Sequence, residues 1–328
     1  MQAAWFENFG PAPEVLQAGV RDTPSPQPGE VLVRLACSGI NPSDVKKRAG
    51  SFPNLLDEGY VIPNSDGAGV IEAVGEGVAA SRVGERVWVY QAQFARRFGT
   101  AAEYVAIDAS RAPRLPDSAS FEVGACLGIP AMTAHRSVFA DGDVNGSTIL
   151  VTGGAGRVGH YAIQWASHAG ARVIATASNS ADSDACKRAG AEVVVNHRNA
   201  NWGEQLLDAT DGEPVDRVVE VEFGANLPTV LQVIRVGGVI ASYSSTQVPE
   251  PALPFLQMMY KDLTIRLVIV YAMPEQAKQA AIRDIDAALS SDKLEHRIAN
   301  NLPLADIARG NELVEMSDRR GAVILSMA

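Results

Sequence analysis

The chain has 328 residues, enough for about two domains, each with a buried core. Its hydrophobic fraction of 47% is ordinary, and no apolar run approaches the roughly 18 residues that cross a membrane, so we expect no membrane partner. The formal net charge of −10, with no basic stretch longer than pairs and triplets, argues against nucleic acid as a main partner.

The start of the chain and its cysteines indicate a compartment. MQAAWFENFG has neither the basic region nor the apolar region of a secretory signal. The three cysteines are widely separated and odd in number, which suits a reducing environment. We therefore expect a cytoplasmic protein without a disulfide framework.

The first 115 or so residues are rich in β-branched runs and in punctuating prolines. Such runs, bounded by Gly, Pro, Asn or Asp, predict short strands and loops. We expect strands over 31–40, 68–75, 85–90 and 102–107.

From residue 121 the pattern changes to alternating helices and strands, which is typical of a doubly wound parallel sheet. We therefore predict an α/β fold: a Rossmann domain over 121–271 and a β-rich domain over 1–120, completed by about 272–328. Expected helices are 121–139, 156–168, 181–189, 202–210, 226–235 and 274–290, and expected strands are 148–152, 172–177, 192–196, 216–221, 238–243, 263–270 and 322–327.

The segment 148–159, TILVTGGAGRVG, carries the clearest functional signal. Gly154, Gly156 and Gly159 fit G-x-G-x-x-G, between an apolar strand and an amphipathic helix. Glycines permit the tight turn and the close approach of backbone N–H groups to a pyrophosphate, while the helix N-terminus adds partial positive charge. The strand before and the helix after are the context that this motif requires. The sequence predicts a dinucleotide-binding protein.

These residues resemble the medium-chain dehydrogenase/reductases, and within them the zinc-free quinone oxidoreductases of the zeta-crystallin type. The resemblance implies a GroES-like fold for the β-rich domain. The matching stretches cover almost the whole chain in the family's order: 39–50, 63–78, 84–88, 99–105, 128–138, the glycine loop, 193–198 and 237–245.

The positions of metal ligands argue against zinc. Zinc-dependent relatives place a Cys near position 40 and a His-Glu pair before G-x-G-V, where this chain has Asn41, Ser65 and Asp66. Asn and Ser are poor Zn²⁺ ligands compared with thiolate and imidazole. Residues 90–110 contain no cysteine for a structural zinc lobe, and Cys37 suits the interior of a strand. We expect no metal.

The end of the second Rossmann strand favours NADPH over NADH. Residues 177–180 carry no carboxylate that would bind a ribose 2′-OH and repel a 2′-phosphate. His197 and Arg198 match family positions near the adenosine phosphate, and Arg198 suits bidentate pairing; the alternative is two solvated turn residues. Asp182 and Asp184 argue the other way, because relatives often have Lys there.

The resemblance also implies which residues surround the cofactor. They are Gly153, Gly154, Ala155, Gly156, Arg157, Val158 and Gly159 at the pyrophosphate; Ser178, Asn179, His197 and Arg198 at the adenosine end; and Gly224, Tyr243, Ser244, Ile269 and Val270 at the nicotinamide and its ribose.

Four residues are candidates at the substrate. Asn41 would donate a hydrogen bond to the carbonyl oxygen that gains charge as hydride arrives; the alternative is a turn residue before Pro42. Thr133 matches a threonine near the nicotinamide, although a helical threonine often bonds only its own backbone. Phe52 suits stacking on a planar ligand. Asp66 would bind substrate, or orient Asn41 or a nearby lysine.

Together these features predict an NADPH-dependent reductase that transfers hydride to a quinone. The alternatives are an enoyl or 2-alkenal reductase, which uses the same cofactor geometry on a C=C bond, and an NADPH-binding structural or RNA-associated protein with little turnover. The resemblance implies a homodimer or a dimer of dimers, and the apolar segment 263–270 suits an edge strand that pairs across a twofold axis.

Overall fold

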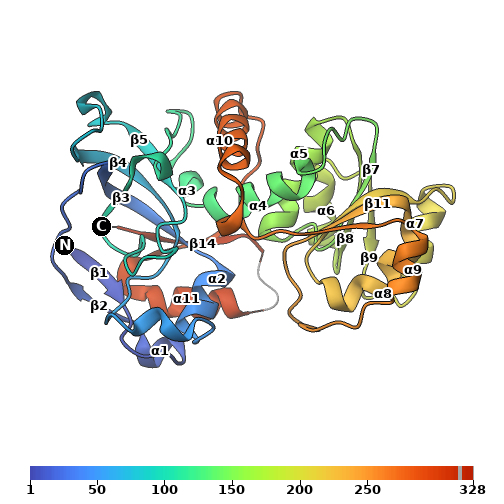
Figure 1. Cartoon of the computed structure of the whole chain (residues 1–328), viewed down its shortest axis with the longest axis horizontal. Helices are drawn as coiled ribbons and strands as arrows, with labels where there is room; N and C mark the ends of the chain where they lie inside the picture. The colour runs from blue at the N-terminus through green and yellow to red at the C-terminus, as the bar shows by residue number, and fades with distance from the viewer. Residues whose placement is uncertain (317–319, 328) are drawn as a thin grey trace. The chain divides into compact units, whose positions relative to one another are not determined.

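The computed structural model describes residues 1–316 and 320–327. By its contacts the chain divides into two compact units, 1–129 with 282–328 and 130–281 (Figure 1). From the sequence we placed these boundaries at about 120 and 271. Among the described residues, no helix is long and apolar enough to cross a bilayer.

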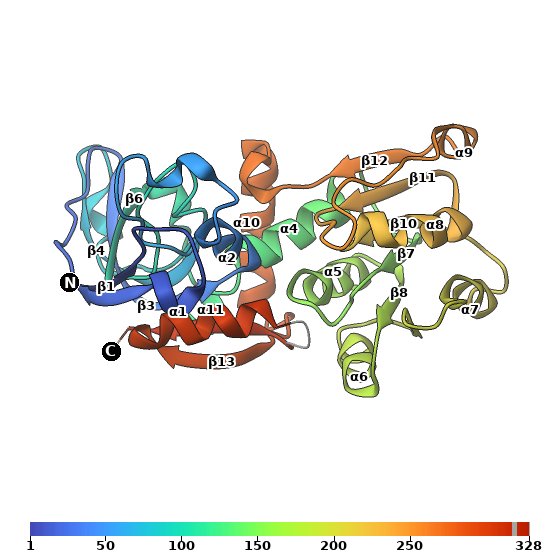
Figure 2. The same cartoon turned by 90° about the horizontal axis from the view of Figure 1, so that it is seen from below.

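The second unit is built on a six-stranded parallel sheet. Its strands follow the order β9-β8-β7-β10-β11-β12, with helices on both faces (Figure 2). This is the Rossmann order, in which the chain reverses direction across the sheet between β7 and β10. The predicted doubly wound fold is therefore confirmed. The strands are β7 (Thr148–Val151), β8 (Arg172–Ala177), β9 (Val193–Asn196), β10 (Val215–Glu220), β11 (Ile234–Ser242) and β12 (Thr264–Leu267).

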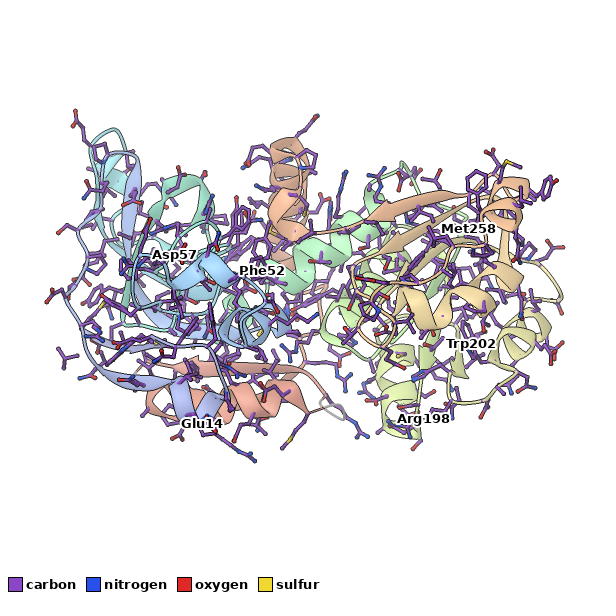
Figure 3. All side chains as sticks on the ribbon, turned by 60° about the horizontal axis from the view of Figure 1, so that its bottom comes forward. Glu14, Phe52, Asp57, Arg198, Trp202 and Met258 are labelled. Carbon is purple, nitrogen blue, oxygen red and sulfur yellow. The ribbon has the colours of Figure 1, made fainter. Side chains whose placement is uncertain are left out.

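Apolar residues from both faces of these strands pack against the helices, as strands buried on two faces require. One core cluster joins Leu150 and Val218 of the sheet to Trp202 and Leu227, with Met258 packed against it (Figure 3). The helices are α4 (Gly128–Phe139), α5 (Arg157–His168), α6 (Ser180–Arg188), α7 (Trp202–Ala209), α8 (Phe223–Val233) and α9 (Phe255–Tyr260).

The first unit contains a mixed sheet and a two-stranded antiparallel ribbon. The sheet order is β13-β14-β3-β4-β5, and β6 pairs with β3. The C-terminal strand β14 pairs antiparallel with β3, so the first unit is discontinuous in sequence. The strands are β1 (Gln2–Trp5), β2 (Gln17–Val20), β3 (Glu30–Ile40), β4 (Asp66–Val74), β5 (Arg86–Val89), β6 (Tyr104–Asp108), β13 (Ile298–Pro303) and β14 (Ala322–Ser326).

Short helices cover this sheet. The C-terminal helix α11 packs on α1, α2 and β14, and a Cβ at its Gly310 would lie 2.6 Å from Ile40, which shows how closely helix and strand approach. The helices are α1 (Ala12–Val15), α2 (Pro42–Arg48), α3 (Phe121–Gly124), α10 (Glu275–Ser290), which continues from the second unit, and α11 (Ile307–Glu315).

Several predicted elements differ in extent, and the structure gives the reason for two of them. The single helix expected over 121–139 is two helices, because the chain turns at 125–127, where the Ala125 carbonyl packs against Gly39. The strand expected over 263–270 ends at Leu267, because its partner β11 ends at Ser242 and only one further bond, Val268 N–H to Ser242 O (2.7 Å), follows.

Candidate active site

The glycine loop joins β7 to α5 at the carboxyl edge of the parallel sheet. Gly153 has φ +59°, a left-handed conformation that favours glycine. Its N–H donates to Thr176 Oγ1 (2.9 Å), and the Gly154 N–H donates to the Thr176 carbonyl (2.9 Å). Gly156 then caps α5. These bonds hold the helix N-terminus directly beyond the end of β7.

The close packing of the loop explains the other glycines. A Cβ at Gly154 would lie 2.8–2.9 Å from Ile163, Ala175 and Cys186, and one at Gly159 would lie 2.4 Å from the carbonyl oxygen of the loop's first glycine. Real Cβ atoms do not approach so closely. The loop therefore admits the helix only when both positions are glycine.

The predicted cofactor residues lie at one edge of this unit. In an open parallel sheet, ligands bind beyond the carboxyl ends of the strands, where the strand order reverses. All of the predicted residues follow such ends: Gly153 to Gly159 after β7, Ser178 and Asn179 after β8, His197 and Arg198 after β9, Gly224 after β10, Tyr243 and Ser244 after β11, and Ile269 and Val270 after β12.

At the predicted adenosine end, the side chain of Asn179 makes hydrogen bonds to the first turn of α6. Its Oδ1 accepts the Asp182 N–H (3.0 Å) and so caps α6, while its Nδ2 donates to Asp182 Oδ2 (2.6 Å). A carboxylate thus lies beside the predicted ribose end, on the first turn of α6 rather than on the strand. Arg198 is exposed (Figure 3), and its N–H donates to Asn196 Oδ1 (3.0 Å).

Sequence reasoning missed Glu220, a fully buried carboxylate at the end of β10. Its Oε1 accepts hydrogen bonds from Thr152 Oγ1 (2.9 Å), Asn226 Nδ2 (2.8 Å) and the Glu222 N–H. Burial raises its pKa, because the charged form loses hydration. Glu220 joins the end of β7 to the start of α8. An acidic residue directly after Val218 and Val219, in the strand predicted over 216–221, was the available signal.

In the first unit, Asn41 and Asp66 are joined directly. Asn41 follows β3 and precedes α2, and its Nδ2 donates to Asp66 Oδ2 (2.8 Å). The same carboxylate oxygen accepts the Ile129 N–H (2.8 Å), and Asp44 Oδ2 accepts the Asn41 N–H (2.8 Å). The structure thus brings together two predicted site residues that are 25 positions apart.

Burial dominates the electrostatics of this cluster. It raises the pKa of Asp66 to about 8, although hydrogen bonds from Ile129 and Asn41 and the charge of Lys47 act to lower it. Lys47 is also buried; its Nζ donates to the Gln93 carbonyl (2.6 Å), and burial lowers its pKa. Asn41 therefore contacts a buried cluster of ionisable groups, Asp66 and Lys47, in which burial disfavours both charges.

The backbone of Asp66 is held as well. Thr100 Oγ1 donates to the Asp66 carbonyl (2.6 Å) and lies 2.8 Å from Ser38 Oγ, which accepts from Asn64 Nδ2 (2.9 Å). This buried chain fixes the start of β4.

The remaining candidates differ in exposure. Phe52 is 50% exposed (Figure 3). Thr133 belongs to the second unit and is buried in α4, where its carbonyl accepts Ser137 Oγ–H (2.8 Å). Cys37 is buried in β3, as expected of a packed strand residue. Within residues 1–316 and 320–327, no three His, Cys, Asp or Glu side chains gather as a metal site requires.

Comparison with known proteins indicates the family to which the chain belongs. Residues 27–117 match the alcohol dehydrogenase GroES-like domain, and residues 158–287 match the zinc-binding dehydrogenase family. The quinone oxidoreductase of Rattus norvegicus is 30% identical over 325 residues, which are 98% of this chain and 95% of that protein. The chain therefore belongs to the medium-chain dehydrogenase/reductases, in their quinone oxidoreductase family, and is an oxidoreductase.

Solved structures agree over the full length. A mycobacterial protein solved in complex with NADPH is 26% identical, with a TM-score of 0.88 over 99% of this chain and 100% of that one. An NAD-dependent alcohol dehydrogenase is 28% identical, with a TM-score of 0.87 over the whole of both chains. The predicted GroES-like and Rossmann folds are thus confirmed.

Proposed function

We propose that this protein uses NADPH to reduce a quinone, without zinc. The observation that carries the proposal is the glycine loop at the point where the strand order reverses, in a chain whose relatives include a quinone oxidoreductase. The strand β8 ends without a carboxylate, which favours NADPH, and a mycobacterial relative binds it.

The second unit fits a dinucleotide. The Gly154 N–H donates to β8. The first turn of the 12-residue helix α5 has N–H groups with no acceptor within the helix itself, and its partial positive charge favours a pyrophosphate. A Cβ at Gly156 would meet only the Gly153 carbonyl, at 3.1 Å, so its absence keeps the helix N-terminus approachable. When bound, the nicotinamide supplies the hydride.

Asn41 is the proposed donor to the substrate oxygen. Asp66 Oδ2 accepts from Asn41 Nδ2 and so determines which end of the amide faces the carboxyl group. The second N–H of the same Nδ2 is then available to a carbonyl oxygen. A donor held in advance stabilises developing negative charge without reorganising during the reaction. Asp66 is thus a positioning residue in this proposal rather than a substrate ligand.

The donor set at this position supports a metal-free reaction. Asn41 and Ser65 replace the stronger zinc ligands expected at these positions. The carboxylate of Asp66 is occupied by Asn41 and by the N-terminus of α4. We expect elemental analysis to find no stoichiometric zinc and chelators to leave turnover unchanged.

A steady-state screen tests the proposal. NADPH oxidation is followed with 1,2- and 1,4-quinones beside 2-alkenals, and each reaction is repeated with NADH. Faster turnover of quinones supports the proposal, and a strong preference for 2-alkenals selects a C=C reductase instead. No oxidation with any acceptor would remove the catalytic claim, and a stoichiometric zinc that activity requires would remove its metal-free part.

We also propose that two copies associate through the β12 edge. β12 pairs only with β11, so its outer edge has unpaired backbone groups. Leu267, the last residue of β12, is 75% exposed, and Ile269 just beyond it is 57% exposed. Helix α9 adds Phe255 and Tyr260 at 70% and 76%. An apolar, strand-edged surface of this kind is typical of a twofold interface.

A further inference from the structure

The Rossmann unit contains a cavity that none of the predicted cofactor residues lines. Between α4 and the first turns of α10, within residues 130–281, the structure has a cavity of about 430 Å³. This volume falls in the range of roughly 300–1,000 Å³ typical of small-molecule sites. Its walls include His135, Arg136, Phe139, Pro274, Gln276 and Ala277.

The charge around this cavity is unbalanced. Asp141 Oδ2 accepts from Arg217 Nη2 (2.7 Å), and both of its carboxylate oxygens accept from Arg266 Nε (2.9 Å each). One carboxylate thus serves two guanidinium groups. Arg136 is the third cation of the group, and none of the hydrogen bonds or ion pairs that the structure gives for the described residues involves its guanidinium group.

Arg136 is therefore a half-buried cation without a direct counter-ion. Burial lowers its pKa, and the charge of Arg266 lowers it further, against the weaker opposing effect of Asp141. Arginine nevertheless stays protonated in proteins, so the unfavourable charge remains. On α10, Glu275 and Lys278 pair with each other at 3.5 Å, so together they leave the balance unchanged. An anion in the cavity would relieve this excess.

The other residues that line the cavity indicate the chemistry of the uncharged part of that anion. The rings of His135 and Phe139 lie 4.7 Å apart, centroid to centroid, and Pro274 and Ala277 add apolar surface. Gln276 supplies an amide beside them. We propose that this cavity is a binding site for a small aromatic carboxylate, whose charge pairs with Arg136 and whose ring packs against the apolar walls.

Calorimetric titration with benzoate, and with neutral benzamide as its matched probe, tests the site. We expect benzoate to bind wild type, to bind more weakly as salt rises, and to bind Arg136→Gln about tenfold or more weakly, because a charge-assisted bidentate pair is lost. Arg283→Gln removes an equal charge from an exposed position of α10 outside the cavity and should bind as wild type does.

A second variant separates the cavity from other basic surfaces. Ala277→Phe fills the space without changing charge and should also abolish benzoate binding, while thermal unfolding checks that each variant is folded. Absence of benzoate binding to wild type, equal binding by Arg136→Gln, or equal binding of benzamide overturns the proposal. Inorganic phosphate that binds as tightly as benzoate would overturn the requirement for an aromatic body.

Discussion

At the scale of single residues, the titration of Asp66, the partner of the proposed donor Asn41, should make the stability of the protein depend on pH. Its pKa in the folded protein, about 8, lies above the ordinary carboxyl value of 3.8. A group with a raised folded-state pKa contributes stability that is complete below the unfolded-state value and is lost as pH rises through the folded-state value. The window therefore runs from about pH 4 to about pH 8.

Asp66→Asn should remove this pH dependence. Relative to the variant, we expect the wild type to lose unfolding free energy between pH 5 and pH 8, by at most about 1.4 kcal/mol per pH unit. Urea unfolding at several pH values measures the difference. The exposed Asp57→Asn (Figure 3) is the matched control. A wild-type-to-variant difference that stays constant across this range would contradict the prediction.

Asn41→Ala should lower kcat for quinones by about a hundredfold, because removal of one positioned donor to a developing oxyanion costs roughly this much. Steady-state kinetics measures kcat and KM separately. Lys46→Ala changes an exposed residue on the adjoining helix α2 and is expected to leave kcat unchanged. Equal kcat values for wild type and Asn41→Ala would show that Asn41 serves only the turn before Pro42.

Asp182→Asn should shift cofactor preference toward NADPH. The Asp182 carboxylate lies 2.6 Å from Asn179, beside the predicted ribose end, where it would repel a 2′-phosphate. We expect the ratio of kcat/KM with NADPH to that with NADH to rise about tenfold, equivalent to roughly 1.4 kcal/mol. Asp184→Asn, at an exposed position of the same helix, should leave the ratio unchanged. An unaltered ratio in Asp182→Asn would place the 2′-phosphate elsewhere.

At the scale of elements, two glycines of one loop should respond differently to alanine. Gly154→Ala would press a methyl group against Ile163, Ala175 and Cys186, and overpacking of this kind costs about 1–3 kcal/mol. The Cβ added by Gly156→Ala would meet only one carbonyl oxygen, at 3.1 Å. This variant should fold normally, but its NADPH binding should be weaker. Thermal unfolding and cofactor titration separate the two effects, and equal stability losses would contradict this assignment.

Elements with strong local signals were the ones that the sequence predicted well. The run 148–159 combines an apolar strand, a turn that only glycine permits and an amphipathic helix, so each part supports the others. Strand β13, by contrast, was not predicted, because its residues IANNLP show no alternation of apolar and polar side chains and are mostly exposed. Its formation depends on pairing with β14, which is a tertiary effect.

The candidate site likewise contains features that local sequence predicts and features that depend on tertiary structure. Asn41 and the loop glycines were found because residue type and local position define their chemistry. The sequence offered Asp66 as a partner of Asn41 only among other roles. The choice among those roles, and the role of Glu220, depend on which strands become neighbours: Asp66 starts β4, paired with Gly39 of β3, and Glu220 ends β10, beside β7. Periodicity along one segment carries no information about such neighbours. The cavity at Arg136 was missed for this reason too.

At the scale of the whole molecule, the β12 edge predicts the assembly. Leu267→Glu places a charge on the exposed apolar surface and should convert a dimer to monomers, because an uncompensated charge is costly to bury in an interface. Size-exclusion chromatography with light scattering measures the mass, and Val20→Glu, an exposed apolar position on β2, is the control. A monomeric wild type would remove the proposal.

The pairing of β14 with β3 also bears on synthesis. Residues 130–281 lie between these two strands, so a ribosome completes the Rossmann unit while residues 37–40 of β3 still lack their β14 partner, because β6 on that side pairs only with residues 30–34. Domains generally fold as units during translation. The N-terminal sheet therefore stays incomplete until β14 has been synthesised, and this unit is the one that we expect to need chaperone protection.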